Sequence, residues 1–327
     1  MGLAQAADNP CPLRQCAYAR IQMHVDTSQH RPVLALLIRL GAIAALSTMA
    51  ALVKLLSERG LHLVEILFWR QFLSLPVLLA WVMLLGGGLA DFATKRPRNH
   101  LRRGLYGLAG MVLNFGAVIL LPLAEATTLN FTAPIWAVIL SALILRERVG
   151  VWRWSAVATG FAGILVITQP GGSSLPLFGA LVGLGAAFMI ALISIQIADL
   201  GRTEKPVTIV FWFAVTSSAV LFVPMLFFTK AHDGTTWALL GLLGLTGTIG
   251  QMLLTAALKY GPVSSVVVMD YSALFWATLF GWYLFDRLPP SSTWLGAPLV
   301  VAAGVVIAWR EHRLGRLRRG TLPPPVR

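Results

Sequence analysis

The sequence predicts an all-α polytopic membrane protein with about ten transmembrane helices, built as two inverted five-helix repeats. Three observations lead to this prediction. Hydrophobic residues make up 57% of the 327 residues and charged residues only 12%, and the mean hydropathy of +0.75 lies outside the range of soluble chains of this length. Long apolar runs recur along the chain, and its two halves carry matching residues in the same order.

The apolar runs are about 18 to 25 residues long, which is enough for a helix to cross the roughly 30 Å hydrocarbon core of a bilayer. Glycine, proline or charged residues bound each run. This pattern is typical of spanning helices and not of a barrel of short alternating strands. The expected spans are residues 33–56, 64–85, 101–121, 126–145, 151–167, 177–198, 207–228, 237–258, 262–285 and 294–308.

The basic residues predict the topology. The formal net charge is +13, and arginine and lysine are dense around residues 95–103 and in the tail after residue 309. The opposite set of loops holds only Lys54, Arg59, Lys230 and Arg287. By the positive-inside rule both termini are cytoplasmic, and the charge does not require a nucleic-acid partner. We expect a multi-pass protein of the plasma membrane, which in a bacterium is the inner membrane, in contact with membrane lipids.

The chain therefore divides into two tails and two repeats. We expect a flexible cytoplasmic tail over 1–32, five-helix repeats over 33–170 and 171–310, and a basic cytoplasmic tail over 311–327. Cys11 and Cys16 lie in the first tail, which has no apolar core to fold around a metal ion. No metal site is expected there.

The repeat is visible as matched residues. They include Phe68-Trp69 with Phe211-Trp212, Asn114 with Gln251, and Leu145-Arg146-Glu147-Arg148 with Phe285-Asp286-Arg287. About five helices in each half is an odd number, so the second half must run upside down relative to the first. Inverted repeats are typical of transporters that work by alternating access, with a substrate site near the bilayer midplane.

Three stretches resemble one known family. They are EILFWRQFLSLPVLL, ATTLNFTAPIWAVILSALILRERV and MDYSALFWATLFGWYLFDRLPPSSTWLGAPLVVAAGVVIAWRE. Together they resemble the EamA branch of the drug/metabolite transporter superfamily over nearly the whole chain after residue 33. The resemblance implies a ten-helix secondary transporter or exporter of small metabolites, with a central cavity lined by both halves. It implies no particular substrate. Phe285-Asp286 departs from the family's usual Gly-Glu at this helix end.

Asp270 is the acid buried deepest in an expected span. It lies about eight residues into the 262–285 run, roughly 12 Å from its cytoplasmic end, which is too far for a short side chain to reach water. A carboxylate there could take up a proton, hold a cationic group of a substrate, accept hydrogen bonds from a neighbouring helix or pair with an arginine. Tyr271, Ser272 and Trp276 beside it offer hydrogen-bonding and stacking groups, although Trp276 could equally belong to the core.

Two arginines lie well inside expected spans, and a further acid lies at the outer end of one. Arg70 suits a carboxylate or phosphate on a substrate, could pair with Asp270, or could extend to the outer surface. Arg39 is close to the cytoplasmic face, and we expect its long side chain to reach that surface. Glu65 is expected at the outer interface.

Neutral polar residues complete the candidate binding groups. Asn114 and Gln251 occupy matched positions, from which they could bridge helices or face one central space. Asn130 precedes Pro134, where we expect either a simple kink or a gating bend in the 126–145 helix. Ion pairs are expected at the two matched helix ends, with a structural or gating role, between Glu147 and Arg148 and between Asp286 and Arg287.

These features favour a secondary transporter of a small organic metabolite, with coupling to protons through Asp270 as a hypothesis. An intramembrane lipid-modifying enzyme is the first alternative, but the chain has no His-Glu-x-x-His, Gly-x-Ser-x-Gly or paired membrane aspartates. We therefore expect no catalytic residues and no cofactor. A receptor or scaffold is the second alternative, and both a monomer and a homodimer stay open.

Overall fold

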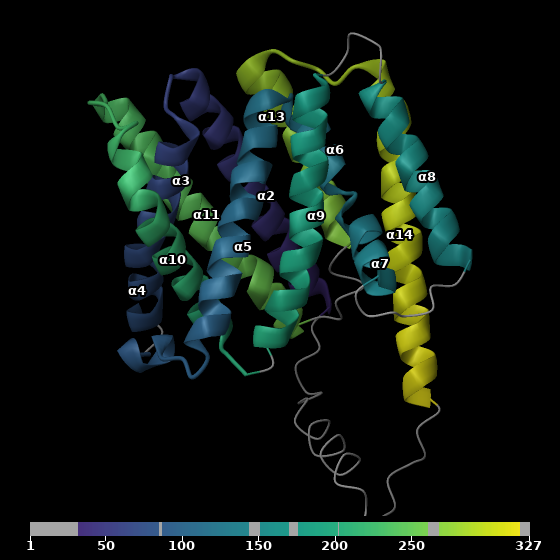
Figure 1. Ribbon diagram of the computed structural model, residues 1–327, viewed down its shortest axis with the longest axis horizontal. Coiled ribbons are helices and arrows are strands. Elements are labelled where there is room, and N and C mark those ends of the chain that lie inside the picture. The colour runs from purple at the N-terminus through teal and green to yellow at the C-terminus, as the bar shows by residue number, and fades with distance from the viewer. Residues whose placement is uncertain are drawn as a thin grey trace, which may run out of the picture.

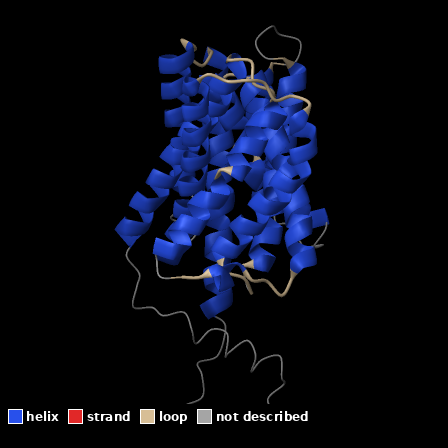
Figure 2. Cartoon of the chain, turned by 90° about the vertical axis from the view of Figure 1, so that its left-hand side faces the viewer, coloured by secondary structure: helices blue, strands red, loops and turns tan. Residues whose placement is uncertain are grey.

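The computed structural model describes residues 32–84, 87–143, 151–169, 176–201, 203–260 and 268–320. Within these ranges all regular structure is helical and no strand is present. The helices stand roughly side by side, and the loops gather at the two ends of the bundle (Figures 1 and 2). Cys11, Cys16, Glu147 and Arg148 lie outside the described residues.

The elements follow one another in chain order. They are α2 (Pro32–Glu58), α3 (Leu63–Phe72), α4 (Ser74–Leu84), η2 (Leu89–Phe92), α5 (Pro97–Leu120), α6 (Leu123–Asn130), α7 (Ala133–Leu143), α8 (Val151–Thr168), α9 (Leu177–Leu200), α10 (Pro206–Leu226), α11 (Gly234–Tyr260), η3 (Val268–Tyr271), α13 (Ser272–Phe285) and α14 (Ser291–Gly320). The start of α2 and the end of α14 lie at the same end of the bundle (Figure 1).

The outer surface of the bundle is apolar, which confirms a multi-pass membrane protein. In the described ranges, seven segments are long and apolar enough to cross a membrane, and two shorter apolar helices cover Trp154–Thr168 and Ser291–Val306. Leu84, Phe227 and Tyr283 are 86%, 80% and 79% exposed. Large apolar side chains exposed in such number fit a surface that faces lipid.

The expected helix over 126–145 is two helices. α6 ends at Asn130, and α7 begins at Ala133, so the break falls just before Pro134. Proline is tolerated in the first turn of a helix because its missing N–H has no helical partner there. The amide of Thr132 donates to the Leu129 carbonyl at 3.0 Å, which keeps the break hydrogen-bonded. The bend that we expected at Pro134 is therefore a helix break upstream of it.

The prediction of one continuous helix over 262–285 is also wrong. Residues 261–267 lie outside the described part, and a 3₁₀ turn, η3, precedes α13. Asp270 belongs to this turn and not to the interior of a helix. Irregular backbone at membrane depth is tolerated where it is buried in protein or lines a polar space.

Lys54 is not the loop cation that the charge pattern suggested. It lies inside α2 and is 5% exposed. Its Nζ donates to the carbonyls of Val118 and Leu121 at 3.1 and 2.7 Å. These carbonyls end α5 just before Pro122, which has no N–H to offer, so the lysine satisfies acceptors that the helix cannot. The charge also complements the negative end of the helix dipole.

Close packing of glycines joins α8 to α14, which lie side by side in Figure 1. A Cβ atom on Gly163 would lie 2.9 Å from the Gly296 carbonyl oxygen, and one on Gly296 would lie 2.7 Å from the Gly163 carbonyl oxygen. The two backbones approach as closely as small residues allow, which is a common way to pack helices in membranes.

We expect Gly296→Ala to lower the apparent melting temperature in detergent, because overpacking of this kind costs about 1–3 kcal/mol. Gly241→Ala is the matched control, since a Cβ atom there meets nothing within 4 Å. Equal melting temperatures for the two variants would contradict the proposed contact between α8 and α14.

Candidate functional site

The carboxylate of Asp270 and the guanidinium of Arg39 form a two-point ion pair. Arg39 Nε donates to Asp270 Oδ1 and Arg39 Nη2 donates to Oδ2, both at 2.6 Å. Arg39 Nη1 donates to the Leu254 carbonyl of α11 at 3.2 Å. The planar fork of arginine matches two carboxylate oxygens in this geometry, which makes the pair strong and specific.

Burial differs between the two partners. The Arg39 side chain is 8% exposed, whereas that of Asp270 is 31% exposed. Arg39 therefore does not reach the membrane surface as we expected. A guanidinium this deep is costly unless an anion compensates it, and Asp270 supplies that anion. The pairing of Asp270 with Arg70, one of the alternatives, is not formed, because Arg39 occupies both carboxylate oxygens.

Tyr271 extends the site towards the break between α6 and α7. Its ring meets that of Phe131 edge to face with the centroids 5.0 Å apart, and its hydroxyl packs against Gly304 of α14. Ser272 Oγ and Trp276 Nε1 are buried without a hydrogen-bond partner. Buried polar atoms are normally paired, so both are free to receive a ligand group.

Asn130 and Asn114 meet beside this break. Asn130 Nδ2 donates to Asn114 Oδ1 at 2.6 Å, and Asn130 Oδ1 is buried without a partner. Gln251, which the sequence predicts to be the repeat counterpart of Asn114, is half-buried in α11. The contact of Tyr271 with Phe131 places the turn that holds Asp270 next to the break that follows Asn130, and the hydrogen bond between Asn130 and Asn114 ties α5 to the same break.

Arg70 lies elsewhere, between α3 and α5. It is 5% exposed, its Nη1 donates to Gln71 Oε1, and the same Nη1 lies 3.4 Å from Met111 Sδ. Its position on α3 is expected from the sequence, but its burial excludes the alternative in which it extends to the outer surface.

Polar contacts hold the end of the bundle where α5 begins and α9 ends. Arg96 Nη2 pairs with Asp199 Oδ2 at 2.7 Å, and Lys205 pairs with Asp91. The hydrogen bond and the charge of the Lys205 ammonium lower the pKa of Asp91 below its ordinary value. The first pair connects the residue before α5 with the end of α9, and the second connects η2 with the segment between α9 and α10.

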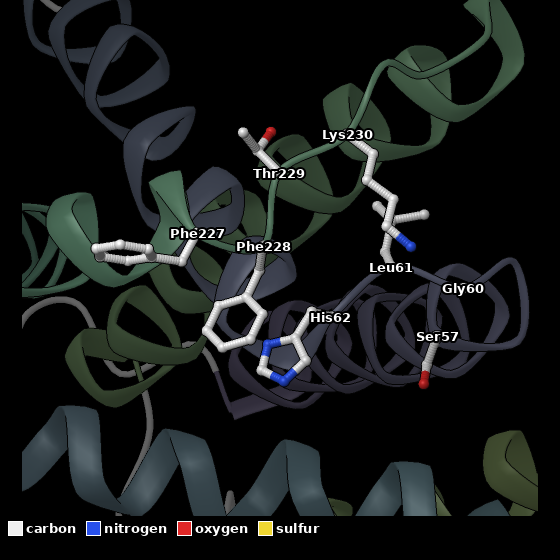
Figure 3. A pocket seen from close by; sticks show the side chains of 8 residues that line it. All are labelled: Ser57, Gly60, Leu61, His62, Phe227, Phe228, Thr229 and Lys230. Carbon is white, nitrogen blue, oxygen red and sulfur yellow. The ribbon is translucent and has the colours of Figure 1, made fainter.

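The opposite end is held by Glu65, which is buried in the protein and 1% exposed. Its Oε1 accepts a hydrogen bond from Thr229 at 2.9 Å and lies 2.7 Å from His232 Nε2. Beside it is a pocket of about 350 Å³, in which the rings of His62 and Phe228 stack 3.8 Å apart (Figure 3). The α2–α3 and α10–α11 connections form this pocket, and Asp270 is not among its lining residues.

The ion pair expected between Asp286 and Arg287 is not formed, since both side chains are exposed and neither pairs with a described residue. Their backbone instead ends α13. Asp286 takes a left-handed conformation with φ of 50°, and the Arg287 amide donates to the Gly281 carbonyl at 2.9 Å. This arrangement is a common helix C-cap.

The sequence does not single out four buried ionisable residues: Lys54, His100, Arg103 and Glu125. Glu125 is 0% exposed in α6, where its Oε1 accepts from Thr293 at 3.3 Å and its Oε2 has no partner. The expected span over 126–145 leaves Glu125 outside, although Pro122 is a signal that a helix begins just before it. The charge pattern groups Arg103 with the basic residues of a loop, and no sequence signal separates it from its exposed neighbour Arg102.

Comparison with known proteins adds a family. The sequence model of the EamA-like transporter family matches residues 33–169 and again residues 177–309. One solved crystal structure superimposes with a TM-score of 0.58 over 86% of this chain and 99% of the other, at 22% identity. At that identity the likeness bears on the fold alone.

Three curated relatives cover most of the chain. A riboflavin transporter of Rhizobium johnstonii is 30% identical over 76% of this chain and 82% of its own. The pseudopaline exporter CntI of Pseudomonas aeruginosa is 29% identical over 80% of this chain and 91% of its own. An S-adenosylmethionine uptake transporter of Rickettsia bellii is 26% identical over 77% and 86%.

We expect Arg39→Gln and Asp270→Asn each to destabilise the protein by about 3 kcal/mol, the lower end for a broken buried ion pair, because each leaves one charge unpaired. The double variant is expected to recover part of that loss, as measured by denaturant unfolding in detergent.

The control is a second double-mutant cycle with Arg96→Gln and Asp199→Asn. The wild-type side chains at these positions are 30% and 55% exposed, so the coupling free energy between them should be about 0.2–1 kcal/mol. Strictly additive losses at Arg39 and Asp270 would contradict the pairing.

Proposed function

This chain belongs to the EamA-like transporter family, and from that premise we propose that it is a secondary transporter that moves a small organic metabolite across the membrane by alternating access. The curated relatives are named for the transport of riboflavin, pseudopaline and S-adenosylmethionine. These compounds share modest size and several polar groups. We assign the same broad class of cargo to this chain.

The proposed architecture has about ten membrane helices, in two inverted repeats that correspond to the two family matches. A pair of helices on either side of a break, such as α6 and α7, would together count as one membrane crossing. Support comes from the common end of the bundle at which α2 starts and α14 ends, and from the dense positive charge near that end (Figure 1). We propose that this end faces the cytoplasm of a bacterial cell.

The observation that carries the mechanism is the ion pair between Arg39 and Asp270. Arg39 belongs to the first family match, whereas Asp270 and Leu254 belong to the second, so the pair joins the two repeats. Asp270 is the more exposed partner. A proton or a cationic group of the substrate that reaches Asp270 competes with Arg39, and the loss of the pair frees the repeats to move relative to each other.

Other polar groups then hold the substrate. Tyr271, Ser272 and Trp276 flank Asp270, and the pair of Asn114 and Asn130 lies across the contact with Phe131. Gln251 is assigned to the same role from its repeat position. Glu147, Arg148, Asp286 and Arg287 are proposed to act at the mouths of the pathway, in states with a different arrangement of the helix ends.

The function is tested with purified protein in proteoliposomes, by following entry of radiolabelled flavins, amino acids, adenosyl compounds and polyamines. We expect saturable flux of at least one class that empty liposomes lack. An absence of flux in both directions and at every pH between 6 and 8 would contradict the transporter assignment.

We expect Asp270→Asn to reduce flux, normalised to the amount of folded protein in the proteoliposomes, about tenfold or more, since charge-assisted hydrogen bonds contribute about 1.5–3 kcal/mol. Asp199→Asn removes a carboxylate from an exposed ion pair and is the control, expected to transport normally. The pH dependence of flux separates the two roles proposed for Asp270. If Asp270 carries a coupled proton, the pH dependence disappears in Asp270→Asn. If Asp270 binds a cationic group of the substrate, the pH dependence persists. Unchanged flux in Asp270→Asn would remove this residue from the mechanism.

A further inference from the structure

Two arginines are buried in the bundle without an ion pair. Arg70 of α3 is 5% exposed and Arg103 of α5 is 9% exposed, and neither forms a salt bridge with any described residue. Arg70 Nε, Arg103 Nε and Arg103 Nη1 are buried donors without a hydrogen-bond acceptor. Arginine stays protonated in proteins, so both side chains are cations.

The two guanidinium groups belong to one cluster, which we define as Arg70, Gln71, Arg103, Met111 and Phe213. The Arg103 guanidinium lies 4.6 Å from the centre of the Phe213 ring, and Gln71 Nε2 donates to the Phe213 carbonyl at 3.4 Å. Gln71 in turn accepts from Arg70, and the like charges of the two arginines are close enough to interact. The cluster thus concentrates positive charge in a small volume.

The surrounding helices make room for this charge. Arg103, Gly107 and Met111 recur at intervals of four residues and so share one face of α5. A Cβ atom on Gly107 would clash with the Arg103 guanidinium, so the missing side chain gives the cation its place. On α10, Ser217 is one turn after Phe213, and its buried hydroxyl has no partner.

The cluster is also shared between the two repeats. Arg70 and Arg103 lie in the first family match, and Phe213 lies in the second. Gly247 of α11 packs against the same arginine, because a Cβ atom there would lie 3.2 Å from Arg70 Nε. Groups in this position change their surroundings when the repeats move against each other, as alternating access requires.

Burial of two unpaired cations is unfavourable, and proteins normally place an anion beside each one. Here the described residues supply a π face, an amide and a thioether, but no carboxylate. We propose that the Arg70–Arg103 cluster is an anion site, which takes a carboxylate or phosphate group of the transported solute once the repeats open. The planar donors of arginine match both groups in two-point geometry.

This inference rests on the proposed transport function and narrows its cargo to a small organic anion. It also separates two roles. Arg39 is neutralised by Asp270, so that pair governs the contact between repeats, whereas the unpaired arginines bind the anionic part of the solute. A solute that also carries a cationic group would bind Asp270 with that group and the Arg70–Arg103 cluster with its anionic group.

The test is a melting-temperature screen of the full chain in detergent with matched anionic and neutral compounds at constant ionic strength. The pairs are flavin mononucleotide with riboflavin, glutamate with glutamine, and glucose 6-phosphate with glucose. We expect at least one anion to raise the melting temperature by about 3 °C or more in a saturable manner, and its neutral partner to have no effect.

Variants assign that effect to the cluster. Arg70→Gln and Arg103→Gln are expected to abolish stabilisation by the anion, whereas Arg96→Gln, which removes an arginine already paired with Asp199, keeps it. Stabilisation that survives in both cluster variants would overturn the proposal. So would stabilisation by phosphatidylglycerol that depends on these arginines when none of the soluble anions binds, since the site would then hold a lipid headgroup.

A second readout needs no ligand. Removing one of two repelling, unpaired cations should raise the melting temperature of the ligand-free protein, so Arg70→Met and Arg103→Met, which keep the apolar stem, are expected to melt at or above the wild-type temperature. Lower melting temperatures in both would indicate a structural role and contradict the anion site.

Flux separates failure of this inference from failure of the transport function. Saturable transport of neutral solutes that no anion of the panel inhibits would overturn the anion site and leave transport intact. Binding of an anion through Arg70 and Arg103, without flux of any solute, would overturn transport and leave the site intact.

Discussion

A charge inside a membrane bundle must be compensated by the protein, because neither water nor lipid can do it. The ion pair of Arg39 with Asp270 is where this constraint acts most directly. Two hydrogen bonds of 2.6 Å hold the carboxylate, and a third holds the arginine to the Leu254 carbonyl. Because the partners are 231 residues apart, satisfying the charge also brings the two repeats together.

The other buried cations obey the same constraint in different ways. Lys54 donates to the carbonyls that end α5, so a helix dipole and two unpaired acceptors compensate it. Arg70 and Arg103 find only an amide, a thioether and a π face. The charge of Arg39 is thus fully compensated, whereas the charges of the Arg70–Arg103 cluster are poorly compensated. The cluster is therefore the place where an anionic ligand can bind.

The sequence predicts the helical membrane fold well, because hydropathy depends on local composition and every apolar run needs a helix in lipid. It also identifies the family, whereas the roles of Asp270, Asn114 and Asn130 stay predictions. Breaks in helices are harder to predict: Pro134 gives a signal, but the break falls before it, because proline fits the first turn of α7. The turn that holds Asp270 has no comparable signal.

Pairing over long separations could not be predicted. Hydropathy places Arg39 near an interface and allows it to reach the surface, whereas its partner is on a turn in the other half of the chain. Lys54, Arg103 and Glu125 were missed for a related reason, since a charge near the end of an apolar run looks like a loop charge. Only the packing of neighbouring helices decides whether such a side chain faces water or the interior.

The most direct test of the central claim is solute flux through a protein with the charges exchanged, Arg39→Asp with Asp270→Arg. The exchange preserves an ion pair between the repeats but removes the carboxylate from position 270. We expect a folded protein with a melting temperature near that of the wild type and flux reduced about tenfold or more, as expected for loss of a charge-assisted contact. Flux restored to the wild-type level would mean that the pair is only a structural link, and would contradict a role for the Asp270 carboxylate in transport.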